Sequence, residues 1–269
     1  MKTFDVMIPA HNESLRQLQE LIMAITFQKV HGWRLGRLFI CSDNPRIQKG
    51  LSGLAHLSLL SQAPGLGKPN ALNMMYEKSR AFYALQNSAD CIPASENTYQ
   101  LLLDPLLNPV FGAVTSRPVS FEPGFLWLPD LVWKCHHFVQ PKLNAELFSF
   151  KRSAVDFLPE TVIHDDAYWH NMVVRCGFQV CYEPRAIVFN SAPKTMSEFY
   201  NQRKKNVIGN LQLEREFHQE APSMLRLRSL IVMSVEILAN LHGRLDYARG
   251  KIPKGLIGYS LESTKEVYA

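Results

Sequence analysis

The stretch MKTFDVMIPAHNES, residues 1–14, carries the signals that decide the fold of the first part of the chain. Residues 4–8 form a short, largely apolar run, as expected of a strand in a buried sheet. The polar segment PAHNES ends this strand, and leucine and isoleucine then recur at helical spacing over residues 15–25. A strand, a polar loop and an amphipathic helix in this order predict the start of an α/β domain.

The same alternation of apolar runs and helical patterns continues to about residue 120. It predicts further strands and two helices, the strands at residues 38–41, 57–60, 82–85 and 111–115 and the helices near 70–81 and 99–107. This order favours a mostly parallel central sheet flanked by helices. Ligands of such sheets bind beyond the carboxyl ends of the strands, so polar residues that follow a strand are candidate site residues.

The pattern changes from about residue 143. It predicts three strands and three helices, the strands at residues 147–150, 178–182 and 187–189 and the helices at 165–175, 196–217 and 223–242. Pro222 and Ser223 would start the last helix. We expect residues 1–195 to form one α/β domain with halves 1–120 and 121–195, and residues 196–269 to form a basic helical region.

Composition restricts the class of protein. Hydrophobic residues make up 46% and charged residues 20% of 269, which suits a globular chain with a sizeable core. No stretch reaches the roughly 18 uninterrupted apolar residues of a spanning helix, and the first residues lack the apolar core of a signal peptide. Five cysteines without CxxC spacing predict reduced thiols and a cytoplasmic location.

The net charge of +5 is concentrated near the carboxyl terminus, where residues 203–254 hold ten basic and five acidic residues. Such a region suits nucleic acid, phosphate-bearing substrates or an anionic membrane surface. A solvated helical face explains the charge equally well.

Four neighbouring strand ends carry polar groups. They are Asn12 with Glu13, Ser42 with Asp43, Lys68 in the segment GLGKPN, and Ser88-Ala89-Asp90. Together they predict a site with acidic groups for a base, a ribose or a metal, and a cation for phosphate. GLGKPN is not a phosphate-binding P-loop, since Gln62 replaces the first glycine and no Ser or Thr follows the lysine. His164-Asp165 lacks the companion residues of an HD-type phosphohydrolase.

Six segments in order resemble family 2 glycosyltransferases. They are VMIPAHNES, ICSDNP, GLGKPNALN, SADCIP, IHDDAYWHNMVVRCGFQV and FYNQRKKNVIG, which together run from about residue 4 to residue 210. The resemblance implies a Rossmann-like nucleotide-diphospho-sugar transferase fold. It also implies transfer of a sugar from a nucleotide donor, typically a UDP-sugar, with inversion at the anomeric carbon.

The resemblance assigns donor-binding roles to the first half of the domain. Pro9, Ala10 and Glu13 would line the base and ribose, Asp43 would read the base, and Lys68 would lie near the nucleotide. Ser88, Ala89 and Asp90 match the family's D-x-D segment, in which Asp90 would hold Mn²⁺ or Mg²⁺. Ser88 replaces the first aspartate, so it brings no charge and leaves one carboxylate for the metal.

The resemblance assigns the acceptor side to the second half. Asp165-Asp166 matches an acidic pair at the start of a helix, and we assign Asp166 as the general base, with capping of the helix as the alternative for both aspartates. Gln202, Arg203 and Lys205 match a Q-x-x-R-W region and would meet the diphosphate or the acceptor, although Asn206 replaces the tryptophan. A solvated basic face is the alternative.

Two weaker hypotheses concern the acceptor. Lys151-Arg152 would begin a segment that approaches it, and an aromatic set would line its cleft or, as the alternative, belong to the core: Trp127, Trp133, His136 and His137.

The expected partners are a nucleotide-sugar donor and a sugar or lipid-linked acceptor, with no nucleic acid. The helix at residues 223–242 mixes leucines with arginines and would contact the inner face of a membrane, or pack on the domain instead. Two other functions stay open. A degenerate sugar-nucleotide-binding protein would explain Ser88 and Asn206, and a sugar-phosphate nucleotidylyltransferase would need a glycine-rich loop where this chain has PAHNES.

Overall fold

The computed structural model describes residues 1–54, 56–120, 141–191, 193, 195–217 and 230–250. The aromatic set expected near the acceptor and the expected helix start at Pro222 and Ser223 lie outside these residues.

One eight-stranded sheet forms the centre of the molecule, in the order β3-β2-β1-β4-β7-β6-β8-β5. Its strands are β1 (Lys2–Ala10), β2 (Trp33–Ser42), β3 (Leu57–Ser61), β4 (Tyr83–Asn87), β5 (Ile92–Pro93), β6 (Phe111–Ser120), β7 (Leu147–Lys151) and β8 (Gln179–Asn190). Strands β1 to β4 pair in parallel, as do β6 and β8, whereas β7 is antiparallel to both of its neighbours and β5 is antiparallel to β8. The predicted mostly parallel sheet is confirmed.

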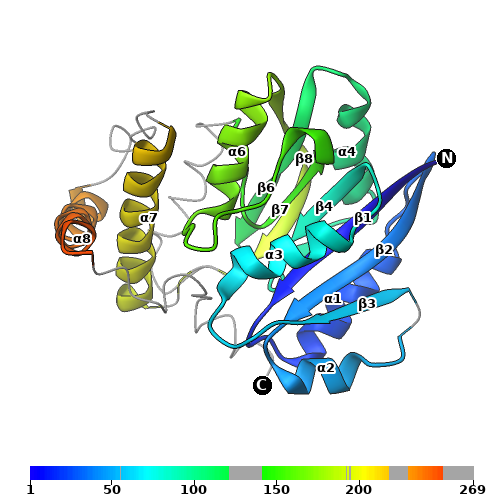
Figure 1. The fold of residues 1–269 in the computed structure, drawn as a ribbon, viewed down its shortest axis with the longest axis horizontal. Helices are drawn as coiled ribbons and strands as arrows, with labels where there is room; N and C mark the ends of the chain where they lie inside the picture. Colours follow the sequence, from blue (N-terminus) through cyan, green and yellow to red (C-terminus); the bar gives the residue numbers. More distant parts are fainter. Residues whose placement is uncertain (55, 121–140, 192, 194, 218–229, 251–269) are drawn as a thin grey trace.

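Helices cover both faces of this sheet (Figure 1). They are α1 (Leu15–Thr26), α2 (Pro45–Leu51), α3 (Gly67–Lys78), α4 (Thr98–Leu103), the 3₁₀ helices η1 (Asp104–Leu107) and η3 (Arg152–Ala154), α6 (Asp165–Arg175), α7 (Met196–Phe217) and α8 (Leu230–Ala248). Because successive side chains of a strand point to opposite faces, Val6 and Ile8 pack with α1, α2 and α4, and Met7 packs with α3 and α6. The sequence therefore builds a three-layer α/β/α domain.

Helices α7 and α8 stand beside this domain, and α8 lies farthest from the sheet (Figure 1). Within the part of the chain that the structure describes, no helix is long and apolar enough to cross a membrane.

Three elements differ from the sequence-based expectations. The strands expected at 178–182 and 187–189 are one continuous strand, β8, because Glu183, Pro184 and Arg185 stay extended. Residues 45–51, for which the sequence predicts no element, form α2, in which Asn44 Oδ1 caps the backbone N–H of Arg46 at 3.0 Å and proline occupies the first turn. Helix α3 begins at Gly67, three residues earlier than expected, which places Lys68 in its first turn.

Candidate functional site

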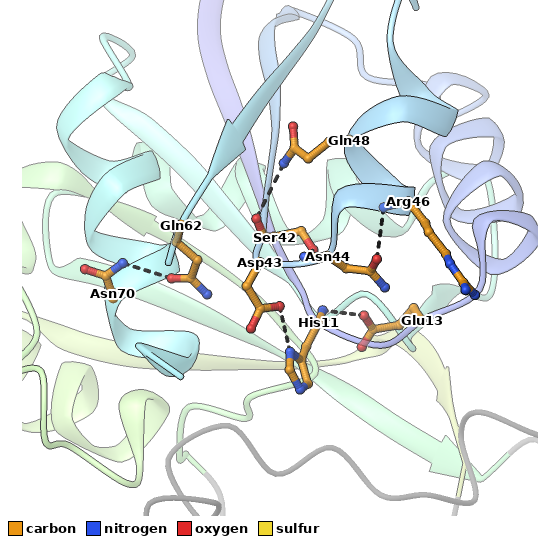
Figure 2. Close-up of polar contacts among 9 residues, drawn as sticks. All are labelled: His11, Glu13, Ser42, Asp43, Asn44, Arg46, Gln48, Gln62 and Asn70. Atoms are coloured by element: carbon orange, nitrogen blue, oxygen red, sulfur yellow. Dashed lines mark hydrogen bonds and ion pairs between the residues drawn. The ribbon is translucent and has the colours of Figure 1, made fainter. Parts of the chain in front are cut away.

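Strands β1 and β2 end side by side, with Pro9 opposite Cys41 and Ala10 opposite Ser42. The loops that follow are joined by a 2.7 Å contact between His11 Nδ1 and Asp43 Oδ1 (Figure 2). The His11 N–H donates to Glu13 Oε2 at 2.6 Å. The Asp43 side chain is only 8% exposed, so the position of its carboxylate is set by this contact and by packing.

The end of the β1 loop is fixed by the start of α1. Ser14 and Gln17 form a capping box, in which the Gln17 N–H donates to Ser14 Oγ and the Ser14 N–H donates to Gln17 Oε1. The loop that carries His11 and Glu13 is therefore held at both ends.

Lys68 reaches the site from the first turn of α3, and the loop between β3 and α3 sets the position of that turn. Gly65 and Gly67 have φ of 82° and 77°, a left-handed conformation that favours glycine and lets the chain turn sharply into α3. Asn70 Nδ2 donates to Gln62 Oε1 at 2.9 Å and ties the helix to the end of β3 (Figure 2). Lys68 Nζ then lies 2.8 Å from Asp165 Oδ2, at the start of α6.

Ser88 connects the end of β4 to the start of β7. Its N–H donates to the carbonyl of Glu146 at 2.8 Å, and its hydroxyl donates to the carbonyl of Ala145 at 2.6 Å. Ser88 therefore fixes the backbone at residues 145 and 146, and its hydroxyl proton is engaged in that contact.

Glu146 is a site residue that sequence reasoning missed. It directly precedes β7, and Asn190 Nδ2 at the end of β8 donates to its Oε1 at 3.2 Å. Burial raises the pKa of Glu146 to about 7, with repulsion from Asp166 and Asp90 adding to the rise and Lys68 opposing it. Burial and Asp90 likewise raise the pKa of Glu13. Electrostatic repulsion thus links Glu13 with Asp90, and Glu146 with both Asp90 and Asp166.

Strand direction explains why Glu146 was missed. Residues that follow a strand lie at the carboxyl edge of the sheet only where the strands are parallel. Strand β7 runs antiparallel to β4, so its first residue, and not its last, reaches the carboxyl edge of the sheet. A polar residue immediately before an apolar run is the only sequence signal, and it is weak.

Helix α6 holds Asp165 and Asp166 in its first turn, as predicted. Trp169 and Val173 are fully buried beneath it, and Trp169 Nε1 donates to the carbonyl of Asp156 at 2.8 Å. Asp165 is engaged by Lys68. Burial alone would lower the pKa of Lys68, but Asp165, with Asp166 and Glu146, outweighs burial and raises it.

Helix α7 brings Lys205 to the same site. Burial lowers the pKa of Lys205, and Asp165 opposes this shift more strongly than any other charge. Arg203 stacks on the Phe199 ring at 5.3 Å and donates to Gln202 Oε1 at 3.0 Å. Lys205 is attracted by both Asp165 and Asp166.

Helix α7 is docked on the segment that leads into α6. Gln212 accepts the N–H of Ile163 at 3.0 Å and donates to the carbonyl of Thr161 at 2.9 Å. Gly209 packs so closely on His164 that an added methyl group would clash with the imidazole. Burial, with Lys142 and Lys205 nearby, lowers the pKa of His164 to about 3, so the ring is neutral at physiological pH.

Lys151 and Arg152 do not support the expected acceptor contact. Lys151 Nζ donates to the carbonyl of Asn108 at 2.9 Å, and Arg152 donates to the carbonyls of Tyr76 and Ser79. Both lie opposite the beginning of β4, away from the carboxyl edge. They stabilise the fold by capping carbonyls, because long basic side chains satisfy such acceptors well.

The donor set decides what kind of metal site is feasible. Within the described residues, no three His, Cys, Asp or Glu side chains group closely enough to hold a metal ion by themselves. Asp90 and Glu146 are nevertheless hard oxygen donors that repel each other, a repulsion that a divalent cation would relieve. The residues therefore fit a cation that also takes oxygens from a bound phosphate.

Comparison with known proteins supports the fold. No family model matches the chain, and no curated protein matches it in sequence. The structure is similar to that of the mannosyltransferase PcManGT from Pyrobaculum calidifontis, solved in complex with GDP-Man and Mn²⁺. The TM-score is 0.65 at 16% identity, covering 97% of this chain and 76% of that one. The expected nucleotide-sugar transferase fold is confirmed.

Proposed function

We propose that this chain is a glycosyltransferase that moves a sugar from a nucleoside diphosphate donor to an acceptor hydroxyl. One observation carries the proposal: acidic and basic side chains gather at the carboxyl edge of the sheet, where Lys68 Nζ lies 2.8 Å from Asp165 Oδ2. Glu146 is repelled there by Asp166 and Asp90, and Lys205 is attracted by Asp165 and Asp166. Ligands of such sheets bind at this edge. The similar structure from Pyrobaculum calidifontis contains GDP-Man and Mn²⁺, which supports the same use of this fold here.

The nucleotide would occupy the ends of β1 and β2. Asp43, held by His11, would accept from the base, and Pro9, Ala10 and Glu13 would line the base and ribose. We propose a UDP-sugar donor because the sequence resembles family 2 glycosyltransferases at these positions. A GDP-sugar is the alternative that the similar structure supports.

Asp90 and Glu146 would hold Mn²⁺ or Mg²⁺ together with the diphosphate. Such a cation, when bound, neutralises charge on the departing diphosphate. Lys205, and Lys68 through its pairing with Asp165, add positive charge at the same place.

Asp166 would serve as the base. Its neighbour Asp165 is engaged by Lys68, whereas no hydrogen bond or ion pair is found for the Asp166 carboxylate among the described residues. In a single displacement, Asp166 takes the proton of the acceptor hydroxyl as its oxygen bonds to the anomeric carbon and the bond to the diphosphate breaks. Attack from the side opposite the leaving group inverts the anomeric carbon. The acceptor would be a sugar or a lipid-linked hydroxyl.

The test is turnover of a panel of nucleotide sugars with Mn²⁺, Mg²⁺ or EDTA, read as released nucleoside diphosphate. Metal-dependent release from one donor, reduced about a thousandfold in Asp166→Asn, is expected because a general base contributes roughly 10²–10⁴. Glu160→Gln, an exposed carboxylate ahead of α6, is the matched control and should leave turnover unchanged.

Other outcomes would decide between the remaining functions. If Asp166→Asn still released nucleoside diphosphate at the wild-type rate, the general base would be a residue other than Asp166. Nucleotide binding without turnover of any donor would favour a non-catalytic sugar-nucleotide-binding protein, which the engaged hydroxyl of Ser88 makes the second candidate. Formation of a nucleotide sugar from a nucleoside triphosphate would indicate a nucleotidylyltransferase. Failure to bind any nucleotide would defeat the proposal.

A further inference from the structure

Over residues 237–248, for which the side chains are described, helix α8 contacts α7 through one face. Lys204 Nζ pairs with Asp246 Oδ2 at 2.5 Å, and the Tyr200 hydroxyl is hydrogen-bonded to His242 Nδ1. Gly243 lies against Val207, and Ala239 is fully buried. Positions 239, 243 and 246 follow helical spacing, so they define the side of α8 that faces α7.

Another face of α8 is apolar and exposed. Ile237, Leu238, Leu241 and Leu245 are 56%, 53%, 54% and 40% exposed. They are spaced so that they line one side of the helix. We call these four residues the α8 stripe. A single exposed leucine needs no explanation, but four on one helical face mark an interaction surface.

The charge around the α8 stripe is positive. Arg244 and Arg249 are exposed, while Asp246 is neutralised by Lys204. Over residues 223–254 the sequence has six basic and two acidic residues. An apolar helical face beside arginines is the pattern of helices that lie in the interface of a membrane.

We propose that the α8 stripe docks on a membrane surface that carries anionic lipids. The four apolar side chains enter the boundary between headgroups and acyl chains, and Arg244 and Arg249 meet lipid phosphates. A second copy of the chain fits less well, because a two-fold contact through the stripe brings the arginines of both copies together. The proposal does not depend on the transferase reaction.

The experiment is flotation of the full chain with two kinds of vesicle, one of phosphatidylcholine alone and one with about one third phosphatidylglycerol. The second kind has a negative surface potential that attracts basic segments. We expect binding to the anionic vesicles, weakened by salt. Leu238→Glu combined with Leu241→Glu should lower partitioning at least tenfold, roughly the effect of moving charges into the apolar boundary. Arg244→Gln, at an exposed position, should lower it about fivefold.

Leu107→Glu is the matched control, because Leu107 is 47% exposed on η1, outside α8, and should leave binding unchanged. Thermal melts followed by circular dichroism verify that each variant folds. If the variant with both leucines replaced fails to fold, Arg244→Gln alone tests the proposal. Three results would overturn it: no binding by the wild type, binding that both α8 variants retain, or binding lost equally in Leu107→Glu. Light scattering that shows the stripe variant breaking an oligomer, without vesicle binding by the wild type, would assign the stripe to a contact between copies.

Discussion

Asp5, near the beginning of β1, and the acidic side chains beyond the carboxyl end of this strand differ in how many hydrogen bonds they accept. Near the beginning of β1, Asp5 accepts the Arg37 N–H at 2.8 Å, the Ser79 hydroxyl at 2.7 Å and the N–H groups of Arg80 and Ala81 at 3.3 Å. Beyond the carboxyl end of β1, Glu146 accepts a 3.2 Å hydrogen bond from Asn190 and one from its own backbone N–H, and it is repelled by Asp166 and Asp90.

We interpret Asp5 as a structural carboxylate and propose that the carboxylates beyond the carboxyl end of β1 serve ligand binding. A buried charge with four donors fixes the chain around it, because each donor would be costly to leave unpaired. Carboxylates that repel one another beside lysines cost stability unless a ligand completes them. The following variants test this distinction, beginning with the largest expected effect.

Asp5→Ala should destabilise the fold most. It leaves three backbone N–H groups and the Ser79 hydroxyl without their acceptor, which should cost about 4 kcal/mol of unfolding free energy. Urea denaturation measures the loss. Asp5→Asn, which keeps one acceptor oxygen, should lose less. Equal stability of Asp5→Ala and the wild type would show that Asp5 is not structural.

Asp90→Asn should weaken ligand binding and leave stability almost unchanged, the opposite of Asp5→Ala. We expect Mn²⁺-dependent binding of the nucleoside diphosphate to weaken about a hundredfold, since a proposed direct ligand is lost, while unfolding free energy changes little. Calorimetric titration of nucleotide with and without Mn²⁺ measures this. If the variant lost stability while nucleotide binding kept its dependence on Mn²⁺, Asp90 would have a structural role like that of Asp5.

Glu146→Gln should weaken Mn²⁺-dependent nucleotide binding about tenfold, because the carboxylate would share the metal with Asp90. The same titration measures it, and Glu160→Gln is again the control. Unchanged metal affinity would show that Glu146 is not a metal ligand and acts on its neighbours only through its charge.

The pKa of Glu146 gives a second readout for this variant. Folding raises the pKa of this carboxyl from 4.5 to about 7, so the folded state holds the proton more tightly than the unfolded chain does. Its contribution to stability is present below pH 4.5 and is lost as pH rises through 7. Without metal, the melting temperature of the wild type should therefore gain more on acidification from neutral pH than that of Glu146→Gln.

Ser88→Ala should have the smallest effect. Loss of the hydrogen bond to the Ala145 carbonyl should cost about 1 kcal/mol. Mn²⁺-dependent nucleotide binding should weaken only slightly, through a small displacement of Glu146. Urea denaturation measures the loss of stability, and the same calorimetric titration measures the change in metal-dependent binding. A loss of metal affinity as large as that in Asp90→Asn would show that the serine contacts the ligand itself.

The sequence predicts most of the strands and helices and many of the polar residues at the carboxyl edge of the sheet. Apolar periodicity and the six resembling segments predicted the parallel strands, the polar strand ends and the helix that starts at Asp165, because these features are local. Glu146 could not be predicted in this way, since its place depends on β7 inserting antiparallel between β4 and β6. The pairing of Lys68 with Asp165, 97 residues apart in the numbering, likewise depends on tertiary packing.

Helix α7 has a consequence beyond holding Lys205. One face, with Gly209 and Gln212, rests on the segment before Asp165, and another, with Tyr200 and Lys204, holds α8. A helix shared by two proposed binding surfaces would link them thermodynamically whenever either ligand shifts it. The linkage is reciprocal, so the factor by which vesicles change nucleotide affinity must equal the factor by which nucleotide changes vesicle affinity.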